Sequence, residues 1–114
     1  MDLNNHQVFS KLDTQNMLDE IKGLPEQLLA GWEEAQSLPL GQFGSPKKVI
    51  IAGVGGSAIA ASLLKAYITP FGSVPLEIHR DYDLPAWANG PDTLVIVSSH
   101  SGNTEETLSV YSKA

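Results

Sequence analysis

The chain has 114 residues, enough for one domain with a modest core, and 42% of them are hydrophobic, as in ordinary globular proteins. Its formal net charge of -6 argues against nucleic acid and anionic membranes as partners, and it requires any anionic ligand to be held by local donors. The chain contains no cysteine, which excludes disulfides and thiolate metal sites. The polar N-terminus lacks the apolar core of a signal peptide, and no apolar run approaches the roughly 20 residues of a membrane span, so we expect a cytoplasmic protein.

Residues 13–38 predict helices, because apolar residues recur there at helical spacing. Gly23 is expected to end a first helix, and Pro25 is expected in the first turn of a second helix. The stretch 39–46 is rich in proline and glycine and predicts a linker. We therefore expect residues 1–46 to form an N-terminal helical segment and linker.

After this stretch, predicted strands alternate with predicted helices. The run KKVIIAG is continuous and β-branched, as in a strand buried on both faces. Strand, helix, strand and then strand, helix is the pattern of a parallel α/β sheet flanked by helices. The predicted elements are strands over 47–53, 74–79 and 94–98 and helices over 58–68 and 103–114.

The third predicted strand, 94–98, is apolar enough to lie inside a sheet rather than at its edge. Three strands make a narrow sheet, and a bare apolar edge invites association with another chain. We therefore expect this sequence to be the first part of a larger protein, with an incomplete sheet. The alternative is a naturally short domain that dimerises across that edge.

Two loops rich in glycine and hydroxyl residues each follow a predicted strand: GVGGSA at 53–58 and SSHSGNT at 98–104. In open parallel sheets, ligands bind at the carboxyl ends of the strands, near the point where the strand order reverses. Glycines let the backbone approach an anion, and the free amides at a helix start point towards it. The candidate phosphate-binding residues are Gly55, Gly56 and Ser57 in the first loop and Ser99, Ser101 and Thr104 in the second.

Each loop also has a purely structural explanation. Asn103 and Glu106 match a capping box, so the second loop would be a helix start, and the glycines of the first loop would serve only close packing. The first loop also fits the dinucleotide fingerprint G-x-G-x-x-A, with Glu77 or Asp81 as the ribose-binding acid. That fingerprint leaves the second loop unexplained, whereas a phosphate cradle uses both loops.

The segment RDYD, Arg80–Asp83, follows the second predicted strand. It is either a loop close to the ligand or to a partner subunit, or a surface turn with an Arg–Asp pair, and we favour the surface turn. Two carboxylates in this segment do not predict a metal site, because no other residues have the spacing of metal ligands.

Together, GVGGSA and SSHSGNTEETL resemble the sugar isomerase (SIS) domain, a phosphosugar-binding module. The stretches MLDEIKGLPEQL and HRDYDLP are more closely similar to the bifunctional phosphoglucose/phosphomannose isomerases, and the resemblance extends from about Met17 to the end. It implies a flavodoxin-like three-layer sandwich with five parallel strands, of which residues 47–114 supply the first part. It also implies that Gly56 and Ser57 contact the substrate and that the three hydroxyls of the second loop hold its phosphate. The family often has tyrosine at position 100; His100 fits the family if its side chain points away from the ligand.

The resemblance implies an aldose–ketose isomerase for glucose 6-phosphate or mannose 6-phosphate and fructose 6-phosphate, commonly a homodimer. A base would move a proton between two carbons through an enediolate, after ring opening, with no metal and no cofactor. The family's catalytic residues lie further along the chain, so none is assigned here, and we expect no turnover from these residues alone. The alternatives are a non-catalytic SIS module that senses sugar phosphates and, less favoured, a dinucleotide-binding Rossmann domain.

Overall fold

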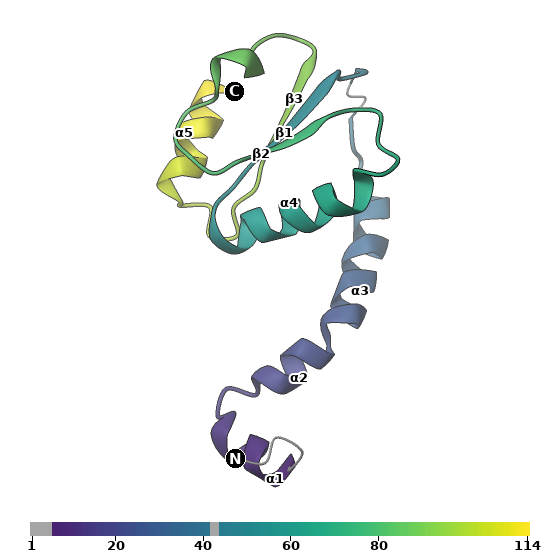
Figure 1. Cartoon of the computed structure of the whole chain (residues 1–114), viewed down its shortest axis with the longest axis vertical. Helices are drawn as coiled ribbons and strands as arrows, with labels where there is room; N and C mark the ends of the chain where they lie inside the picture. The colour runs from purple at the N-terminus through teal and green to yellow at the C-terminus, as the bar shows by residue number, and fades with distance from the viewer. Residues whose placement is uncertain (1–5, 42–43) are drawn as a thin grey trace. The chain divides into compact units, whose positions relative to one another are not determined.

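The structure, a computed structural model, describes residues 6–41 and 44–114. The chain divides into two compact units, Met1–Gly41 and Gln42–Ala114, which are described separately (Figure 1). The linker predicted over 39–46 includes Gln42 and Phe43, which lie outside the described residues.

The first unit is helical, as the sequence predicts. The Asp13 carboxylate accepts hydrogen bonds from the backbone N–H groups of Met17 and Leu18, both at 2.7 Å, and so satisfies the start of the second helix. Gly23 separates the second and third helices, and Pro25 lies in the first turn of the third, so the predicted split is confirmed. The helices are α1 (His6–Leu12), α2 (Met17–Lys22) and α3 (Leu24–Ser37).

The apolar face of α3 is exposed. Leu24, Leu28 and Trp32 recur every four residues along the helix, and Trp32 is 65% exposed. No residue of α2 or α3 is buried. Within this unit, α2 and α3 are therefore stabilised by local hydrogen bonds rather than by a core.

The second unit contains a three-stranded parallel sheet in the order β2-β1-β3. The strands are β1 (Lys48–Ala52), β2 (Leu76–His79) and β3 (Thr93–Val97). Ile50 of β1 lies opposite Glu77 of β2 and Val95 of β3, so β1 is paired on both sides. The predicted α/β class and parallel sheet are confirmed. In the described chain β3 lies at an edge of these three strands, where Ile96 is 42% exposed; the expectation that it lies inside a larger sheet stays a prediction.

Helices α4 (Gly55–Ile68) and α5 (Glu105–Lys113) flank the sheet. α4 contacts β1 and β2, whereas α5 contacts β3, and the two helices lie on opposite sides of the strands (Figure 1). α4 lies in the crossover from β1 to β2, and residues 80–92 cross from β2 to β3 in the opposite direction, so right-handed crossovers put these two connections on opposite faces of the sheet. α4 begins three residues before its predicted start, so Gly55 and Gly56 lie in its first turn, whereas Gly53 precedes the helix.

The core of this unit is small and centred on β1. Ile50 is fully buried, and Ile51 and Ala52 are also buried, so both faces of β1 are covered, as its β-branched run predicts. α4 contributes Ala58 and Ala61, whose small side chains let the helix lie close to the strands. From α5, Val110 is almost fully buried.

Gly53, directly after β1, is where the two candidate loops touch. A Cβ atom at this position would lie 2.9 Å from the Ser98 carbonyl oxygen and 3.3 Å from Cβ of Ser57. The first distance is shorter than van der Waals contact allows, and the obstacle is backbone that cannot rotate away. Only glycine therefore lets the chain after β3 approach the chain after β1 this closely.

We predict that Gly53→Ala destabilises the chain by about 1–3 kcal/mol, the usual cost of forcing a methyl group into a closely packed site. The matched control is Gly56→Ala, three residues away, where a Cβ would meet no atom within 4 Å. Urea unfolding followed by circular dichroism measures both changes. Equal stability of the two variants would show that the loops do not pack closely at Gly53.

Candidate functional site

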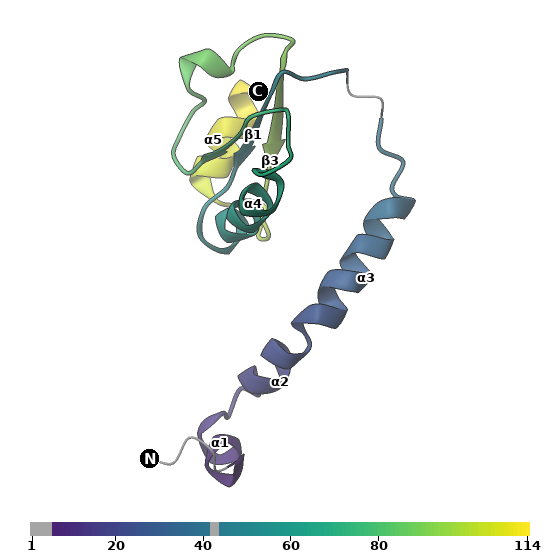
Figure 2. The ribbon, with the colours of Figure 1, turned by 45° about the vertical axis from the view of Figure 1, so that its right-hand side comes forward.

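The two candidate loops leave the sheet at the carboxyl ends of neighbouring strands, β1 and β3 (Figures 1 and 2). From β1 the chain goes to β2 on one side and later to β3 on the other, so the strand order reverses between β1 and β3. The Ser98 N–H donates to the Ala52 carbonyl at 2.8 Å, which continues the pairing up to the start of both loops. The loops therefore meet at the switch point where open parallel sheets bind ligands.

The first loop forms an uncapped start of α4. Val54 is the N-cap in extended conformation, and no side chain donates or accepts a capping hydrogen bond there. Gly55 and Gly56 are exposed and Ser57 is half-buried. The N–H groups of this first turn lack intrahelical partners, so they are available to an anion at the positive end of the helix dipole.

The structural requirement for glycine differs among the positions of the first loop. Gly55 has a φ of 56°, in the left-handed region that favours glycine. Gly56 lacks a positive φ, and a Cβ there would meet nothing within 4 Å. Close packing is the role of Gly53, so packing does not explain Gly56, whereas the close approach of a ligand would.

The second loop brings three hydroxyls together, and we call Ser99, Ser101 and Thr104 the hydroxyl cluster. Oγ1 of Thr104 lies 3.3 Å from Oγ of Ser99 and 3.4 Å from Oγ of Ser101. The Gly102 N–H donates to Ser99 Oγ at 3.1 Å, and the Asn103 N–H donates to Ser101 Oγ at 3.3 Å. A hydroxyl that accepts from the backbone keeps its own hydrogen for donation. The contacts with Thr104 use hydroxyl hydrogens of the cluster itself, so these hydroxyls would have to rotate to donate to one anionic group.

The capping box predicted for Asn103 and Glu106 is wrong. The N-cap of α5 is Thr104, one residue later, and no side chain caps it by a hydrogen bond. Because the helix begins at Glu105, Glu106 is only its second residue and does not occupy the third position that a capping box needs. Helix capping therefore leaves the hydroxyl cluster unexplained.

The strand order also disfavours the dinucleotide alternative. In the usual dinucleotide-binding order the third strand lies beside the second, whereas here β3 lies beside β1. Glu77 lies within β2, opposite Ile50, rather than at the strand's end. The other candidate acid, Asp81, already accepts a hydrogen bond from the Tyr82 N–H at 2.8 Å, so its carboxylate has a partner within its own segment.

Comparison with known proteins finds relatives of this chain. The chain is 41% identical over 99 residues to the bifunctional phosphoglucose/phosphomannose isomerase of Caldicellulosiruptor bescii, covering 86% of this chain and 29% of that protein. It is 34% identical over 73 residues to the protein of the same name from Thermoplasma volcanium, covering 64% of this chain and 23% of that protein. This chain is a homologue of the bifunctional phosphoglucose/phosphomannose isomerases.

The resemblance to these isomerases is thus confirmed. The matched region spans less than a third of the length of the curated relatives; for the protein of Aquifex aeolicus, 38% identical over 69 residues, it spans 21%. No protein-family model and no solved structure matches the chain.

In this isomerase homologue, the segment Arg80–Asp83 is an exposed bend, in agreement with the predicted surface turn, but the predicted ion pair within it does not form. Among the ion pairs of the described residues none includes Arg80, so the expected Arg–Asp pair is wrong. Arg80 Nη2 instead donates to Ser62 Oγ of α4 at 2.8 Å, and the Tyr82 hydroxyl donates to the Glu105 carboxylate of α5 at 3.1 Å. The sequence gives no sign of these contacts, because the partners lie 18 and 23 residues away in the chain.

The contact with α5 raises the pKa of Tyr82. The hydrogen bond to Glu105 is the largest cause, followed by the negative charge of Glu106, because both disfavour a phenolate beside them. His100 is exposed, like Ser101 of the cluster, and the expected direction of its side chain stays a prediction.

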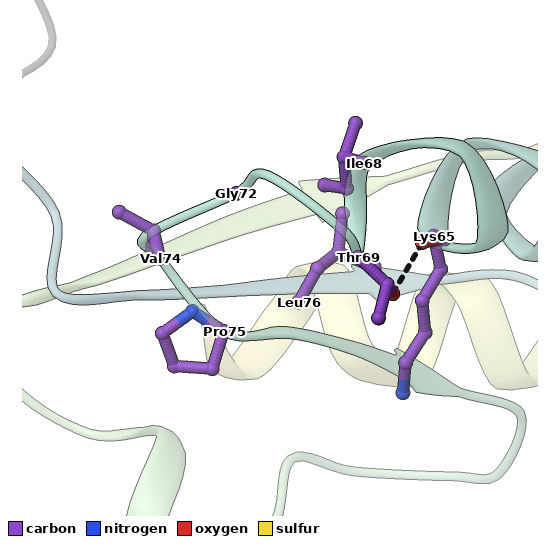
Figure 3. A pocket seen from close by; sticks show the side chains of 7 residues that line it. All are labelled: Lys65, Ile68, Thr69, Gly72, Val74, Pro75 and Leu76. Carbon is purple, nitrogen blue, oxygen red and sulfur yellow. Dashed lines mark hydrogen bonds between the residues drawn. The ribbon is translucent and has the colours of Figure 1, made fainter.

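The hollow in Figure 3 lies at the other end of the sheet from the two loops. It has a volume of about 190 Å³ and is bounded by the end of α4 and the start of β2. Thr69 Oγ1 donates to the Lys65 carbonyl at 2.6 Å, so this hydroxyl already has a partner. The lining residues are Lys65, Ile68, Thr69, Gly72, Val74, Pro75 and Leu76. The hollow is mostly apolar, and it lacks the converging hydroxyls that make the two loops the better candidate for an anion.

Two searches of the described residues concern other kinds of site. Within residues 6–41 and 44–114, no three His, Asp or Glu side chains gather as metal ligands would. In the same residues, no helix has the length and apolar character needed to cross a bilayer.

We predict that Glu105→Gln lowers the pKa of Tyr82 towards the ordinary value of 10.0, because the charged acceptor is lost. Since the folded-state pKa is raised, the contact stabilises the folded chain below pH 10 and is lost as the pH rises through the raised pKa. NMR of the tyrosine ring carbons against pH measures this, with Tyr82 assigned by Tyr82→Phe. Glu26→Gln, in the first unit, is the control and should change nothing; an unchanged Tyr82 pKa in Glu105→Gln would show that the contact is absent.

Proposed function

We propose that this chain is the phosphosugar-binding part of an aldose–ketose isomerase acting on glucose 6-phosphate or mannose 6-phosphate and fructose 6-phosphate. The observation that carries the proposal is the convergence of the hydroxyl cluster beside the uncapped first turn of α4, in a homologue of phosphoglucose/phosphomannose isomerases. The ligand-binding residues would be Gly55, Gly56, Ser57, Ser99, Ser101 and Thr104.

A sugar phosphate suits the donors available at this place. The chain carries a formal net charge of -6, so its overall field repels a phosphate, and binding has to come from groups in direct contact. Hydroxyls and backbone N–H groups supply such contacts, and hydrogen bonds to a charged oxygen are roughly twice as strong as those between neutral groups. The N-terminal ends of α4 and α5 add the positive ends of two helix dipoles.

In the proposed reaction the phosphate serves only for binding, because it is distant from the two carbon atoms between which the proton moves. A base takes a proton from the carbon beside the carbonyl, and the resulting enediolate receives a proton on the neighbouring carbon, which interconverts aldose and ketose. Binding the phosphate fixes the sugar chain so that these carbons meet the base in a defined orientation. The proposal assigns binding, and not proton transfer, to the two loops. It places the whole enzyme in the cytoplasm as a homodimer without metal or cofactor.

We predict that Thr104→Val weakens fructose 6-phosphate binding about tenfold or more, since a hydrogen bond to a charged group contributes roughly 1.5–3 kcal/mol. Valine keeps the shape of threonine but removes the hydroxyl at the centre of the cluster. Gly56→Ala should also weaken binding, because its methyl group would lie where the ligand approaches. Isothermal titration calorimetry measures both.

The matched control is Thr69→Val. Thr69 also carries a hydrogen-bonded hydroxyl, but it lies beside the hollow at the opposite end of the sheet, so its removal should leave the affinity unchanged. Equal affinities of wild type and Thr104→Val for fructose 6-phosphate would contradict the proposed site.

A further inference from the structure

The segment Arg80–Asp83, which we call the clasp, leaves β2 at the same end of the sheet as the two candidate loops. It contains no helix or strand, yet its residues contact both helices that begin at the candidate site. These contacts connect two helices that lie on opposite sides of the sheet.

One end of the clasp holds α4. Arg80 donates to Ser62 Oγ, and the Ser62 hydroxyl in turn donates to the Ala58 carbonyl at 2.9 Å, one turn earlier in the helix. Ala58 is buried against the sheet and follows Ser57 directly. The contact therefore lies next to the turn that offers its N–H groups to the ligand.

The other end of the clasp holds α5 at two points. Tyr82 binds Glu105, the residue that directly follows Thr104 of the hydroxyl cluster. The Asp83 N–H donates to Ser109 Oγ at 3.0 Å, and the Ser109 hydroxyl donates to the Asp83 carboxylate at 3.1 Å. Two successive residues of the clasp thus fix the first two turns of α5.

Asp83 adopts a backbone conformation that needs such support. Its φ of 53° lies in the left-handed region, which costs a residue other than glycine roughly 1–2 kcal/mol, although aspartate and asparagine tolerate it best. The paired bonds with Ser109 hold the residue there. A residue other than glycine keeps a left-handed backbone conformation only where surrounding contacts fix it there. Such residues are common at ligand-binding sites.

We propose that Tyr82 and Asp83 are positioning residues for the phosphate site, because they hold the start of α5, and with it the hydroxyl cluster, against the first turn of α4. The inference rests on the proposed function for the identity of the ligand. It adds a role that does not require the segment to touch the ligand or the reacting atoms.

The expected sizes of the effects on stability and on ligand affinity favour a positioning role over a general stabilising role. Tyr82 is 50% exposed and Asp83 is exposed, and polar contacts at such places contribute little to the free energy of unfolding. A binding site is more demanding, because its donors must stay within about 0.5 Å of the productive geometry. Loss of a clasp contact should therefore affect ligand affinity more than stability.

The test compares Tyr82→Phe and Asp83→Ala with two matched variants. Tyr111→Phe removes a hydroxyl from an exposed tyrosine on α5 itself. In Asp83→Asn, asparagine also tolerates the left-handed region, and its amide oxygen can accept a hydrogen bond from the Ser109 hydroxyl. Each variant is measured for the dissociation constant of fructose 6-phosphate, for its thermal midpoint, and for amide exchange at Gly102 and Asn103 without ligand.

We expect Tyr82→Phe and Asp83→Ala to bind about fivefold more weakly, the equivalent of roughly one net hydrogen bond. Amide exchange at Gly102 and Asn103 should be faster in both variants, because these N–H groups donate to the hydroxyl cluster. Asp83→Asn should restore the affinity, Tyr111→Phe should match wild type, and the thermal midpoints of Tyr82→Phe and Asp83→Asn should stay close to wild type. Asp83→Ala should lower the midpoint by a few degrees, because alanine tolerates the left-handed region less well than aspartate.

Wild-type affinity and exchange in both clasp variants would overturn the positioning role while leaving the proposed function intact. A fall in thermal midpoint that parallels the fall in affinity, without rescue by Asp83→Asn, would also overturn it, because the clasp would then act only on stability. If wild type does not bind fructose 6-phosphate, the proposed function fails. Faster exchange in the clasp variants would then still support the positioning role, and unchanged exchange would overturn it too.

Discussion

Parallel pairing of β1 with both of its neighbours is the constraint on which the candidate site depends. With β2 on one side and β3 on the other, the chains that leave β1 and β3 emerge side by side at the same end of the sheet. Gly53 then permits contact between them, since any side chain there would strike the Ser98 carbonyl. Had β3 paired with β2 instead, the hydroxyl cluster would lie two strands away from the first turn of α4.

The proposed site would bind its anion without charged side chains in either loop. Its donors are hydroxyls and backbone N–H groups at two helix starts, which are fixed by the fold and lose little conformational freedom when a ligand binds. Such a site requires the two loops to keep their relative positions. Neither loop has long side chains that could reach the ligand if the other loop moved. The clasp meets this demand from a third segment by holding α4 through Arg80 and α5 through Tyr82 and Asp83.

Local sequence patterns predicted much of this chain. The β-branched run of β1, the helix break at Gly23 and Pro25, and the alternation of strands and helices were all correct, because each depends on residues that are near one another in sequence. The expected place of β3 inside a larger sheet stays a prediction, because it depends on neighbours other than the three described strands. The helix boundaries at both loops were wrong by two or three residues, and the capping box failed with them.

The contacts of the clasp could not be predicted from sequence. Ser62 and Ser109 are ordinary helical serines, and only the fold brings them to Arg80 and Asp83. The converging hydroxyls of the second loop were easier to anticipate, because Ser99, Ser101 and Thr104 lie within six residues and a turn at Gly102 brings them together.

The most direct test of the two-loop site is an NMR titration of backbone amides with fructose 6-phosphate, with NAD added to a parallel sample. If the site is correct, the sugar phosphate alone shifts amides in both loops, at Gly55, Gly56, Ser57, Ser99, Ser101 and Thr104. Shifts with NAD around residues 53–58 and Asp81, without any at the hydroxyl cluster, would contradict it and identify a nucleotide-binding domain. The absence of any shift with fructose 6-phosphate would contradict it equally.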